Sequence, residues 1–318
     1  MKTLFFHSIL LVLLFQFLPA ATAETAYLGY SDYQIVTDPG FDAEEYLIAT
    51  QSYGVNFQRI WVTGYSNAGG RIDERMPFIE RDGKYALLEL DPAYLDRLTN
   101  VLTLARKHGQ RVMLTLFDHW SLSTIFERTP WHYRNNHERA LKKGIPDFYS
   151  IKDRKLTRIQ ERFVRQIVSA TKEFEPIYEI MNEAGGANCR ILHRWHAKVA
   201  GWILEEDPDA ELAVNLMQEC DAVLTADWVD VISYHAGSWL DPGICATVRQ
   251  SPGKNVIIDT DGAWKIRHDN DLVRSWLLET VKCGASFNHK DDIYKPDLEI
   301  LKFYRAIRDD TEAKERTR

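Results

Sequence analysis

Eight short apolar, β-branched runs alternate along the chain with segments of helical periodicity, and this alternation constrains the fold more than any other feature. The runs span 26–30, 57–63, 111–117, 177–181, 211–217, 230–234, 255–260 and 285–288. Helices are expected over about 42–53, 91–108, 155–174, 191–206, 269–282 and 297–309, with a short one near Cys245. Repeated βα units predict a parallel sheet, and eight of them predict a closed barrel. We therefore expect an α/β fold, a single (β/α)8 TIM barrel, with a doubly wound open sheet as the alternative.

Two insertions interrupt this pattern and predict long loops around an active site. Residues 77–88 contain two strand-like runs around Asp82-Gly83, which is a hairpin signal. Residues 118–153 are irregular and rich in Trp, Tyr, Phe and His. Long irregular stretches in compact domains are either functional or disordered, and the aromatic content of this one indicates order.

The first residues predict export. Lys2 is followed by an apolar run over 4–18 and then by Ala21-Thr22-Ala23, which is the pattern of a secretory signal peptide. We expect residues 1–23 to be removed, leaving one barrel domain over 24–318 that is secreted or periplasmic. No other run has the length to span a membrane.

Charge and cysteine content further restrict which partners and metal sites the protein can have. The formal net charge of the 318-residue chain is -7 and no basic block is present, which excludes a nucleic-acid partner because such binders present a basic face. Four cysteines allow three disulfide pairings. Cys189 and Cys220 both fall in loops at the same barrel end and are the expected pair. No C-x-x-C spacing indicates zinc, and we expect neither a metal nor another cofactor.

The carboxyl ends of the predicted strands carry a dense cluster of polar and aromatic residues, and barrels of this kind hold their chemistry at that end. Two carboxyl groups there predict glycoside hydrolysis, in which one protonates the glycosidic oxygen and the other attacks or activates water. Glu183 is the predicted acid/base. Asp261 is the favoured partner because it stands at the very end of its strand, and Asp259 is the alternative because period-two alternation puts it on the same side.

Aromatic rings and hydrogen-bonding groups around the two carboxyls predict sugar binding. The residues expected to contact substrate are Arg59, Trp61, His119, Trp120, Asn182, Tyr234, His235, Trp264 and Asn288. Asn182 suits a sugar 2-hydroxyl, and the Trp rings, with Trp131 and Trp239 as further candidates, suit the apolar faces of sugars.

Residues 177–183, Ile-Tyr-Glu-Ile-Met-Asn-Glu, resemble the strand-four signature of the clan A glycoside hydrolases, the cellulase-like TIM-barrel glycosidases. Residues 57–61 and the pair Tyr234-His235 are also similar to segments of that clan. The resemblance implies that Glu183 is the acid/base and that Arg59 supports the nucleophile. The chain departs from the clan at strand seven, where Asp259-Thr260-Asp261-Gly262 replaces a segment that normally ends in Glu.

The sequence thus predicts a secreted glycoside hydrolase that acts on an oligo- or polysaccharide through two carboxylates, with retention favoured over inversion. Two alternatives stay open. One is a carbohydrate-binding barrel without catalysis, suggested by the missing strand-seven Glu. The other is a metal-dependent hydrolase using Asp118, His119, His235 and Asp261. The sugar, the linkage and the choice between exo and endo attack are not determined.

Overall fold

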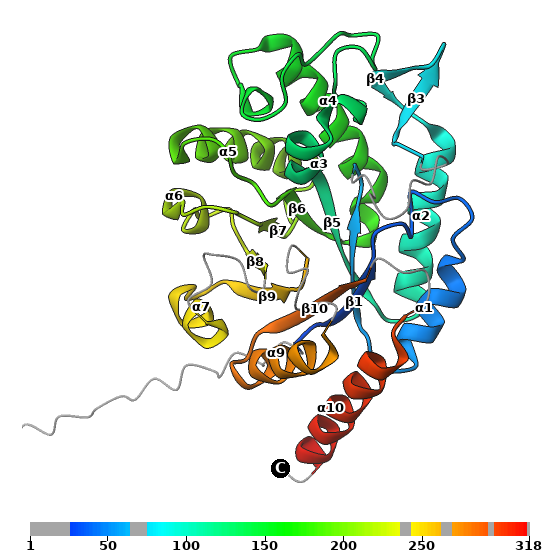
Figure 1. Ribbon diagram of the computed structural model, residues 1–318, viewed down its shortest axis with the longest axis vertical. Coiled ribbons are helices and arrows are strands. Elements are labelled where there is room, and N and C mark those ends of the chain that lie inside the picture. The colour runs from blue at the N-terminus through cyan, green and yellow to red at the C-terminus, as the bar shows by residue number, and fades with distance from the viewer. Residues whose placement is uncertain (1–25, 64–74, 236–242, 262–268, 292–295, 317–318) are drawn as a thin grey trace, which may run out of the picture.

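Eight parallel strands close into a barrel in the computed structural model, which describes residues 26–63, 75–235, 243–261, 269–291 and 296–316 (Figure 1). Around the barrel the order is β1 (Leu28–Asp32), β10 (Ser286–Asp291), β9 (Asn255–Asp259), β8 (Val231–His235), β7 (Leu212–Val214), β6 (Ile177–Asn182), β5 (Arg111–Asp118) and β2 (Phe57–Trp61). Strand β1 pairs with both β10 and β2. The predicted (β/α)8 barrel is therefore confirmed, and the open-sheet alternative is wrong.

Helices connect the strands and cover the outside of the barrel (Figure 1). The longer ones are α1 (Ala43–Gln51), α2 (Pro92–Lys107), α4 (Arg154–Thr171), α5 (Cys189–Glu206), α7 (Ile244–Gln250), α9 (Asn270–Lys282) and α10 (Leu298–Arg316). An aspartate side chain accepts backbone N–H bonds at the first turn of α1, α2, α4 and α9, which satisfies donors that a helix leaves unpaired. Among the described helices, none is both long and apolar enough to cross a membrane.

Some of the expectations fall on residues that are not described. The predicted signal peptide, residues 1–23, is one of them, and Trp239 and Trp264 lie outside the described ranges as well.

The barrel interior is apolar at the end where the strands begin. One residue from each of six strands forms this layer: Phe57, Met113, Ile177, Ala213, Val231 and Ile257. The next inward-facing layer is polar and includes Arg59, Thr115 and Glu179, which bond to one another. The core thus supports the base of the barrel and leaves the strand ends for polar groups.

The insertion over 118–153 is ordered by aromatic packing, as its composition indicates. It contains the short helices α3 (His119–Thr124), η1 (Phe126–Arg128) and η2 (Asp147–Tyr149). Phe117 at the end of β5 contacts the rings of Trp131, Phe148, Phe163 and Trp195 at centroid distances of 5.3 to 5.8 Å. Trp131 is 2% exposed and packs within this cluster, so it forms part of the core, and its contact with a sugar stays a prediction.

The predicted hairpin is present as β3 (Phe78–Arg81) and β4 (Lys84–Leu90), which pair antiparallel around Asp82-Gly83. It lies beside the 118–153 insertion, since the backbone of Tyr85 bonds to that of Asn135 and His137. The two insertions therefore support each other on one side of the barrel.

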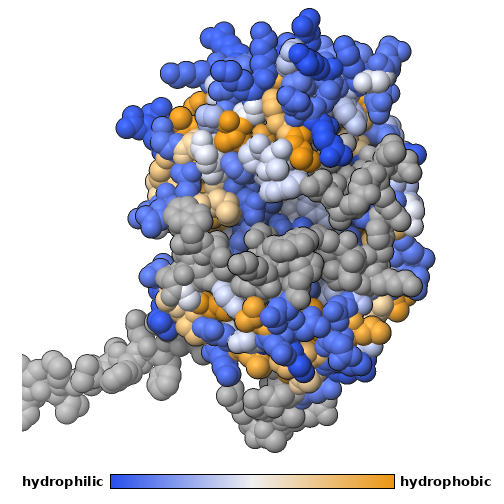
Figure 2. All heavy atoms as spheres, in the orientation of Figure 1, coloured by the Kyte–Doolittle hydropathy of each residue, from blue (hydrophilic) through white to orange (hydrophobic). Residues whose placement is uncertain are grey.

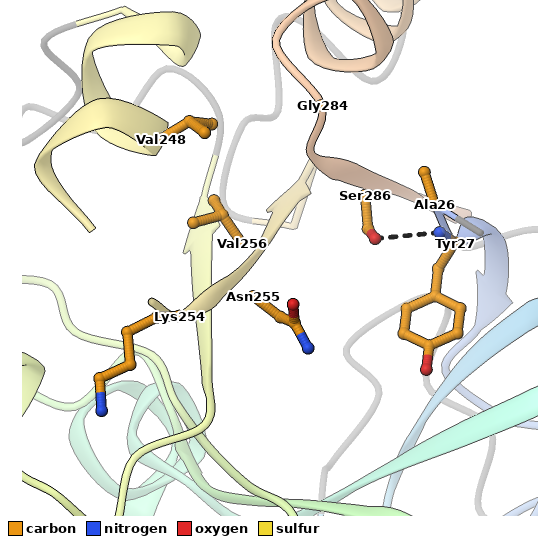
Figure 3. Close-up of a pocket in the computed structure, with 8 residues that line it drawn as sticks. All are labelled: Ala26, Tyr27, Val248, Lys254, Asn255, Val256, Gly284 and Ser286. Atoms are coloured by element: carbon orange, nitrogen blue, oxygen red, sulfur yellow. Dashed lines mark hydrogen bonds between the residues drawn. The ribbon is translucent and has the colours of Figure 1, made fainter. Parts of the chain in front are cut away.

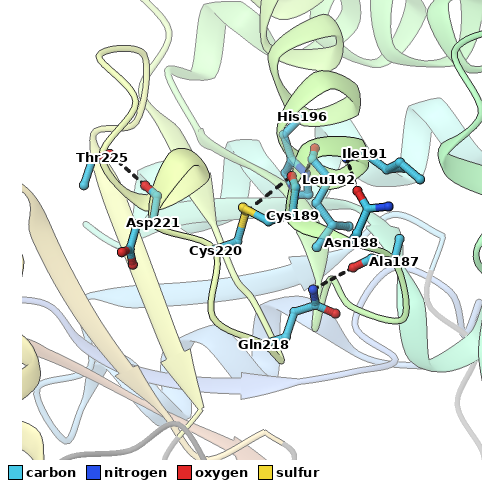
Figure 4. Close-up of a disulfide and its surroundings, with 10 residues drawn as sticks. All are labelled: Ala187, Asn188, Cys189, Ile191, Leu192, His196, Gln218, Cys220, Asp221 and Thr225. Carbon is cyan, nitrogen blue, oxygen red and sulfur yellow. Dashed lines mark hydrogen bonds between the residues drawn. A yellow bond between two sulfur atoms is a disulfide. The ribbon is translucent and has the colours of Figure 1, made fainter.

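Two disulfides join the four cysteines, and both lie among connections on the barrel's outside. Cys189 at the start of α5 pairs with Cys220 at the start of α6 (Asp221–Leu224), as the sequence predicts (Figure 4). Cys245 of α7 pairs with Cys283 after α9. The first disulfide links the connection that follows β6 to the one that follows β7, and Gln218 Nε2 donates to Ala187 O across the same two connections.

Polar side chains cover most of the described surface in view, and apolar ones form small separate patches (Figure 2). The large exposed apolar residues are spread over several elements, with Leu298 the most exposed at 54%. Isolated apolar residues of this kind are normal on a protein surface.

We expect Phe117→Ala to lower the free energy of unfolding by about 3–5 kcal/mol, because it removes a fully buried ring from the centre of the aromatic cluster. Urea denaturation of the two proteins measures the difference. The matched control is Leu298→Ala at the exposed start of α10, for which we expect a change within about 0.5 kcal/mol. An equal loss in both variants would contradict the assignment of the cluster as a major part of the core.

Candidate active site

A buried arginine organises the carboxyl ends of the strands. Arg59 of β2 is 0% exposed and donates to Glu179 Oε2 from Nε at 3.0 Å and from Nη2 at 2.6 Å. Nη2 also donates to Asn182 Oδ1 at 2.7 Å, and Nη1 donates to Asp261 Oδ2 at 3.3 Å. Burial opposes the charge of Arg59, but the carboxylates of Glu179, Asp259 and Asp261 hold its pKa above the ordinary value. The Arg59 side chain thus joins its own strand β2 to β6 and to the end of β9.

The two aspartates at the end of β9 lie side by side but in different settings. Asp259 is 0% exposed; its Oδ1 accepts from the backbone N of Asp261 at 2.6 Å and its Oδ2 from Asn288 Nδ2 at 2.6 Å. Asp261 ends the described segment with a side chain 9% exposed, and Lys290 Nζ lies 3.1 Å from its Oδ1. Burial opposes ionisation, but Lys290, His235 and Arg59 lower the pKa of Asp261 well below its ordinary value.

Asn182 lies between two charged groups. Its Oδ1 accepts from Arg59 and its Nδ2 donates to Asp118 Oδ1 at 2.9 Å. Asp118 also accepts from the backbone N of Trp120 and Ser121 at the start of α3, and burial raises the pKa of its carboxyl.

The strand carrying Asn182 departs from strict alternation. Glu179 and Asn182 both bond to Arg59 although three positions separate them, whereas a regular strand would put them on opposite faces. The intervening Ile180 and Met181 both belong to the core between the barrel and its helices. This irregularity turns Asn182 inward, and Glu183 follows at the point where the strand ends.

Glu183 is held in an unusual backbone conformation. Its φ is +53°, a backbone conformation that residues other than glycine adopt at a cost of about 1–3 kcal/mol. Asn215, just after β7, fixes this conformation, since its Oδ1 accepts from the backbone N of Glu183 at 2.7 Å. Residues in strained conformations of this kind cluster at functional sites.

The Glu183 carboxylate contacts a buried histidine. Its Oε1 lies 2.9 Å from His235 Nδ1. Burial disfavours the charged imidazolium, but the hydrogen bond and the charge of Glu183, with that of Asp261, raise the pKa of His235 above the ordinary value. Because the charges of both Glu183 and Asp261 raise the pKa of His235, the three side chains belong to one cluster.

His119 and Trp120, at the start of α3, lie beside this cluster and are half-buried. His119 Nδ1 lies 3.1 Å from the hydroxyl of Tyr149, which also accepts from the backbone N of Gly185 at 3.3 Å. Burial lowers the pKa of His119. Tyr149 thus connects α3 to the segment that follows Glu183.

Two other residues predicted to contact substrate, Trp61 and Tyr234, pack against neighbouring side chains. Trp61 is 1% exposed, with Arg59 Cζ 4.5 Å from its ring centroid. Tyr234 lies on the outer face of β8, between inward-facing Ser233 and His235, and its hydroxyl bonds to Ser251 at the end of α7. Their sugar contacts stay predictions.

Asn288 is fully buried and bonds to Ser31 Oγ and Asp259. A Cβ on neighbouring Gly29 would lie 2.3 Å from Asn288 Oδ1, so the glycine makes room for this amide. Asn288 thus positions Asp259, and its sugar contact also stays a prediction.

Tyr33 also belongs to the cluster, since its hydroxyl donates to Asp118 Oδ2 at 3.3 Å. Sequence reasoning missed four members of the cluster: Tyr33, Glu179, Asn215 and Lys290. Only Glu179 had a signal in the sequence. Phe57 and Ile177 face inward in the same layer, and period-two alternation then puts Arg59 and Glu179 in the next layer. Lys290 was missed because β10 was expected to end at Asn288, whereas it continues to Asp291 alongside β1.

A pocket at the opposite barrel end is built from strand beginnings. Tyr27, Lys254, Asn255 and Ser286 are among its lining residues, and the backbone N of Tyr27 donates to Ser286 Oγ at 2.9 Å (Figure 3). Lys254 Nζ donates to the backbone carbonyls of Ala226 and Val229. This pocket holds no carboxylate pair, and in barrels this end contributes to stability.

Metal-ligand geometry gives no support to the metal-dependent alternative. In the part of the chain that the structure describes, no three His, Cys, Asp or Glu side chains gather closely enough to hold one ion.

Solved structures share this fold, although no protein-family model and no curated protein matches the sequence. An endo-1,4-β-mannanase from Rhizomucor miehei is 13% identical with a TM-score of 0.60, covering 84% of this chain and 86% of its own. A glycoside hydrolase family 5 enzyme from Prevotella bryantii is 12% identical with a TM-score of 0.59, covering 88% and 95%. A glycoside hydrolase described as putative, from Bacteroides vulgatus, is 16% identical with a TM-score of 0.65, covering 90% and 57%. At these identities the likeness shows a shared barrel fold.

The Glu183–His235 contact predicts a pH-dependent stability. Because the folded pKa of His235 is raised, its contribution is fully present below the unfolded value of about 6.5 and is lost as pH rises through the folded pKa. We expect the difference in free energy of unfolding between the wild type and His235→Gln to decrease above about pH 6.5. Urea denaturation at pH 5 to 9 measures it.

His196→Gln is the matched control, because burial lowers the pKa of His196 to about 4. A lowered histidine pKa has the opposite sign: its contribution is present above the unfolded value and is lost as pH falls. Parallel pH trends in the two variants would contradict the assigned His235–Glu183 interaction.

Proposed function

We propose that this protein is a secreted glycoside hydrolase that cleaves O-glycosidic bonds in an oligo- or polysaccharide, with Glu183 as acid/base and Asp261 as partner carboxylate. The observation that carries the proposal is that one cluster holds two carboxyl groups with different neighbours. Asp261 contacts two fixed cations, while Glu183 contacts an imidazole. Glycosidases use two carboxyl groups that flank the glycosidic bond and take different roles, and these two carboxyl groups have different neighbours.

Asp261 suits the nucleophile better than Asp259. Both Asp259 oxygens accept short hydrogen bonds and its side chain is 0% exposed. Asp261 retains some exposure and its lowered pKa keeps it ionised, as an attacking carboxylate must be. Asp259 then acts as a positioning residue, because its Oδ1 holds the backbone N of Asp261.

The proposed reaction proceeds in two displacements. Glu183 donates its proton to the glycosidic oxygen while an Asp261 oxygen bonds to the anomeric carbon, so the aglycone leaves as an alcohol. Glu183, now a carboxylate, takes a proton from water as the water oxygen replaces Asp261 at that carbon. The net configuration is retained. Asn182 uses one amide N–H for Asp118, and the second N–H of an amide is proposed to contact the 2-hydroxyl.

The fold neighbours support the choice of substrate, and the disulfides support the proposed location. Endo-1,4-β-mannanases share the fold, so β-1,4-mannan is the first polysaccharide to test, with cellulose and xylan beside it. Two disulfides suit an oxidising compartment outside the cytoplasm, which supports the proposed export.

A carbohydrate-binding barrel without turnover is the second candidate. Both oxygens of Asp261 are engaged by cations, and aspartate is one methylene shorter than the glutamate of the clan pattern. This role predicts saturable binding with no product, so any cleaved glycoside excludes it.

Glu183→Gln is expected to lower kcat by about 10²–10⁴-fold, the usual contribution of general acid–base catalysis, while the Kd for an uncleaved oligosaccharide changes little. Reducing-sugar release and calorimetric titration measure the two quantities. The matched control is Glu211→Gln, at the far barrel end beside Arg111, which should keep wild-type turnover. Full activity of Glu183→Gln would exclude the proposed role.

Removal of the nucleophile should be repairable by an external anion. We expect Asp261→Gly to lose turnover and to regain it in millimolar azide, with an activated aryl glycoside as substrate, because azide can occupy the space left by the carboxylate. NMR of the product should show a glycosyl azide of inverted configuration. Azide rescue of Asp259→Gly in place of Asp261→Gly would reverse the assignment of the two aspartates.

A further inference from the structure

Lys290 makes a buried ion pair with Asp261, the proposed nucleophile. It lies in β10, is 7% exposed, and its Nζ is 3.1 Å from Asp261 Oδ1. Arg59 Nη1 lies 3.3 Å from the other oxygen, Oδ2. Each oxygen of the Asp261 carboxylate thus has its own cation, one supplied by β2 and the other by β10, the strand that pairs with β9.

Two aromatic rings lie close to the Lys290 ammonium group, and a hydrogen bond fixes the Lys290 backbone. Lys290 Nζ lies 4.7 Å from the ring centroid of Tyr33 and 5.7 Å from that of Trp61, and aromatic faces attract cations at such distances. The backbone N of Lys290 donates to Thr260 Oγ1 at 3.0 Å. This bond joins β10 to the residue just before Asp261.

The charged groups around Asp261 show why a second cation matters. Arg59 faces it from β2, His235 from β8 and Lys290 from β10, while carboxyls are contributed by Asp118 of β5 and by neighbouring Asp259. Arg59 is shared with Glu179 and contacts Asp259 as well. The Lys290 ion pair with Asp261 adds a second positive charge at this position, where several carboxyl groups crowd together.

We propose that Lys290 is a positioning residue that keeps the Asp261 carboxylate ionised and oriented, so that hydrolysis continues in acidic solution. The inference rests on the proposed function for its effect on activity, but the ion pair itself can be tested without turnover. Tyr33 and Trp61 support the ammonium group, which gives these two buried rings a role at the site apart from any contact with sugar.

The direct test is a ¹³C NMR titration of carboxyl-labelled aspartate, with the Asp261 signal assigned by its loss in Asp261→Asn. In Lys290→Met we expect the Asp261 midpoint to rise by about one pH unit or more, since an opposite charge this close usually shifts a carboxyl by about one to three units. Lys290→Arg should keep the wild-type midpoint. Lys254→Met, which removes a lysine bonded to backbone carbonyls at the far barrel end, is the matched control and should leave the midpoint unchanged.

Activity gives a second readout. An aspartate with an ordinary pKa of about 3.9 is only about 30% ionised at pH 3.5. If the midpoint in Lys290→Met reaches that ordinary value, the ratio of kcat/KM at pH 3.5 to that at pH 6 should fall about threefold relative to the wild type. A smaller rise of the midpoint should give a proportionally smaller fall, and Lys290→Arg should recover the wild-type ratio. Circular dichroism establishes that each variant is folded, and Lys290→Gln replaces the Met variant if that one does not fold.

The two readouts separate this inference from the proposed function. Identical Asp261 midpoints in the wild type and Lys290→Met would overturn the role of Lys290, even if the enzyme is active. A raised midpoint in a protein that cleaves no glycoside would support the effect of Lys290 on ionisation and defeat the proposed hydrolase function.

Discussion

The guanidinium of Arg59 is the interaction on which the carboxyl end of the barrel depends. A fully buried cation is unfavourable unless counter-charges and hydrogen bonds surround it, and here Glu179, Asp261 and Asn182 provide them from β6 and the end of β9. These partners are distant in sequence, so they meet only when the barrel closes. The same contacts that compensate the buried charge also orient the two candidate catalytic segments, which makes the geometry of the site a condition of the fold.

Sequence patterns were sufficient for the barrel because each of its elements carries a local signal. The apolar runs, the aspartates that begin the helices and the Asp82-Gly83 turn all correspond to observed elements. The candidate acid was found in the same way, from Asn182-Glu183 at a strand end. Period-two alternation was less reliable near the site, because β6 turns Ile180 and Met181 together toward the helices and so brings Asn182 inward.

The remaining site members depend on contacts between distant segments, which no local pattern encodes. Lys290 joins the site because β10 pairs with β1 for longer than its composition indicates. Trp131 lies in the core because its indole packs against the rings of Phe78, Phe117, Phe148 and Phe163. A tryptophan in a long connection can lie at the surface or in the core. Only the tertiary packing decides between these two locations.

The left-handed backbone at Glu183 has a consequence for how such a chain can change over generations. Glycine adopts a positive φ without steric cost because it has no Cβ atom, so a glycine at position 183 would relieve the backbone strain. Under the proposed function, selection for a more stable fold and selection for a proton donor act in opposite directions on this one codon. A descendant barrel that no longer needed the proposed acid would gain stability by replacing Glu183 with glycine. The buried Arg59 and its partners would persist longer, because removing one partner leaves a buried charge uncompensated.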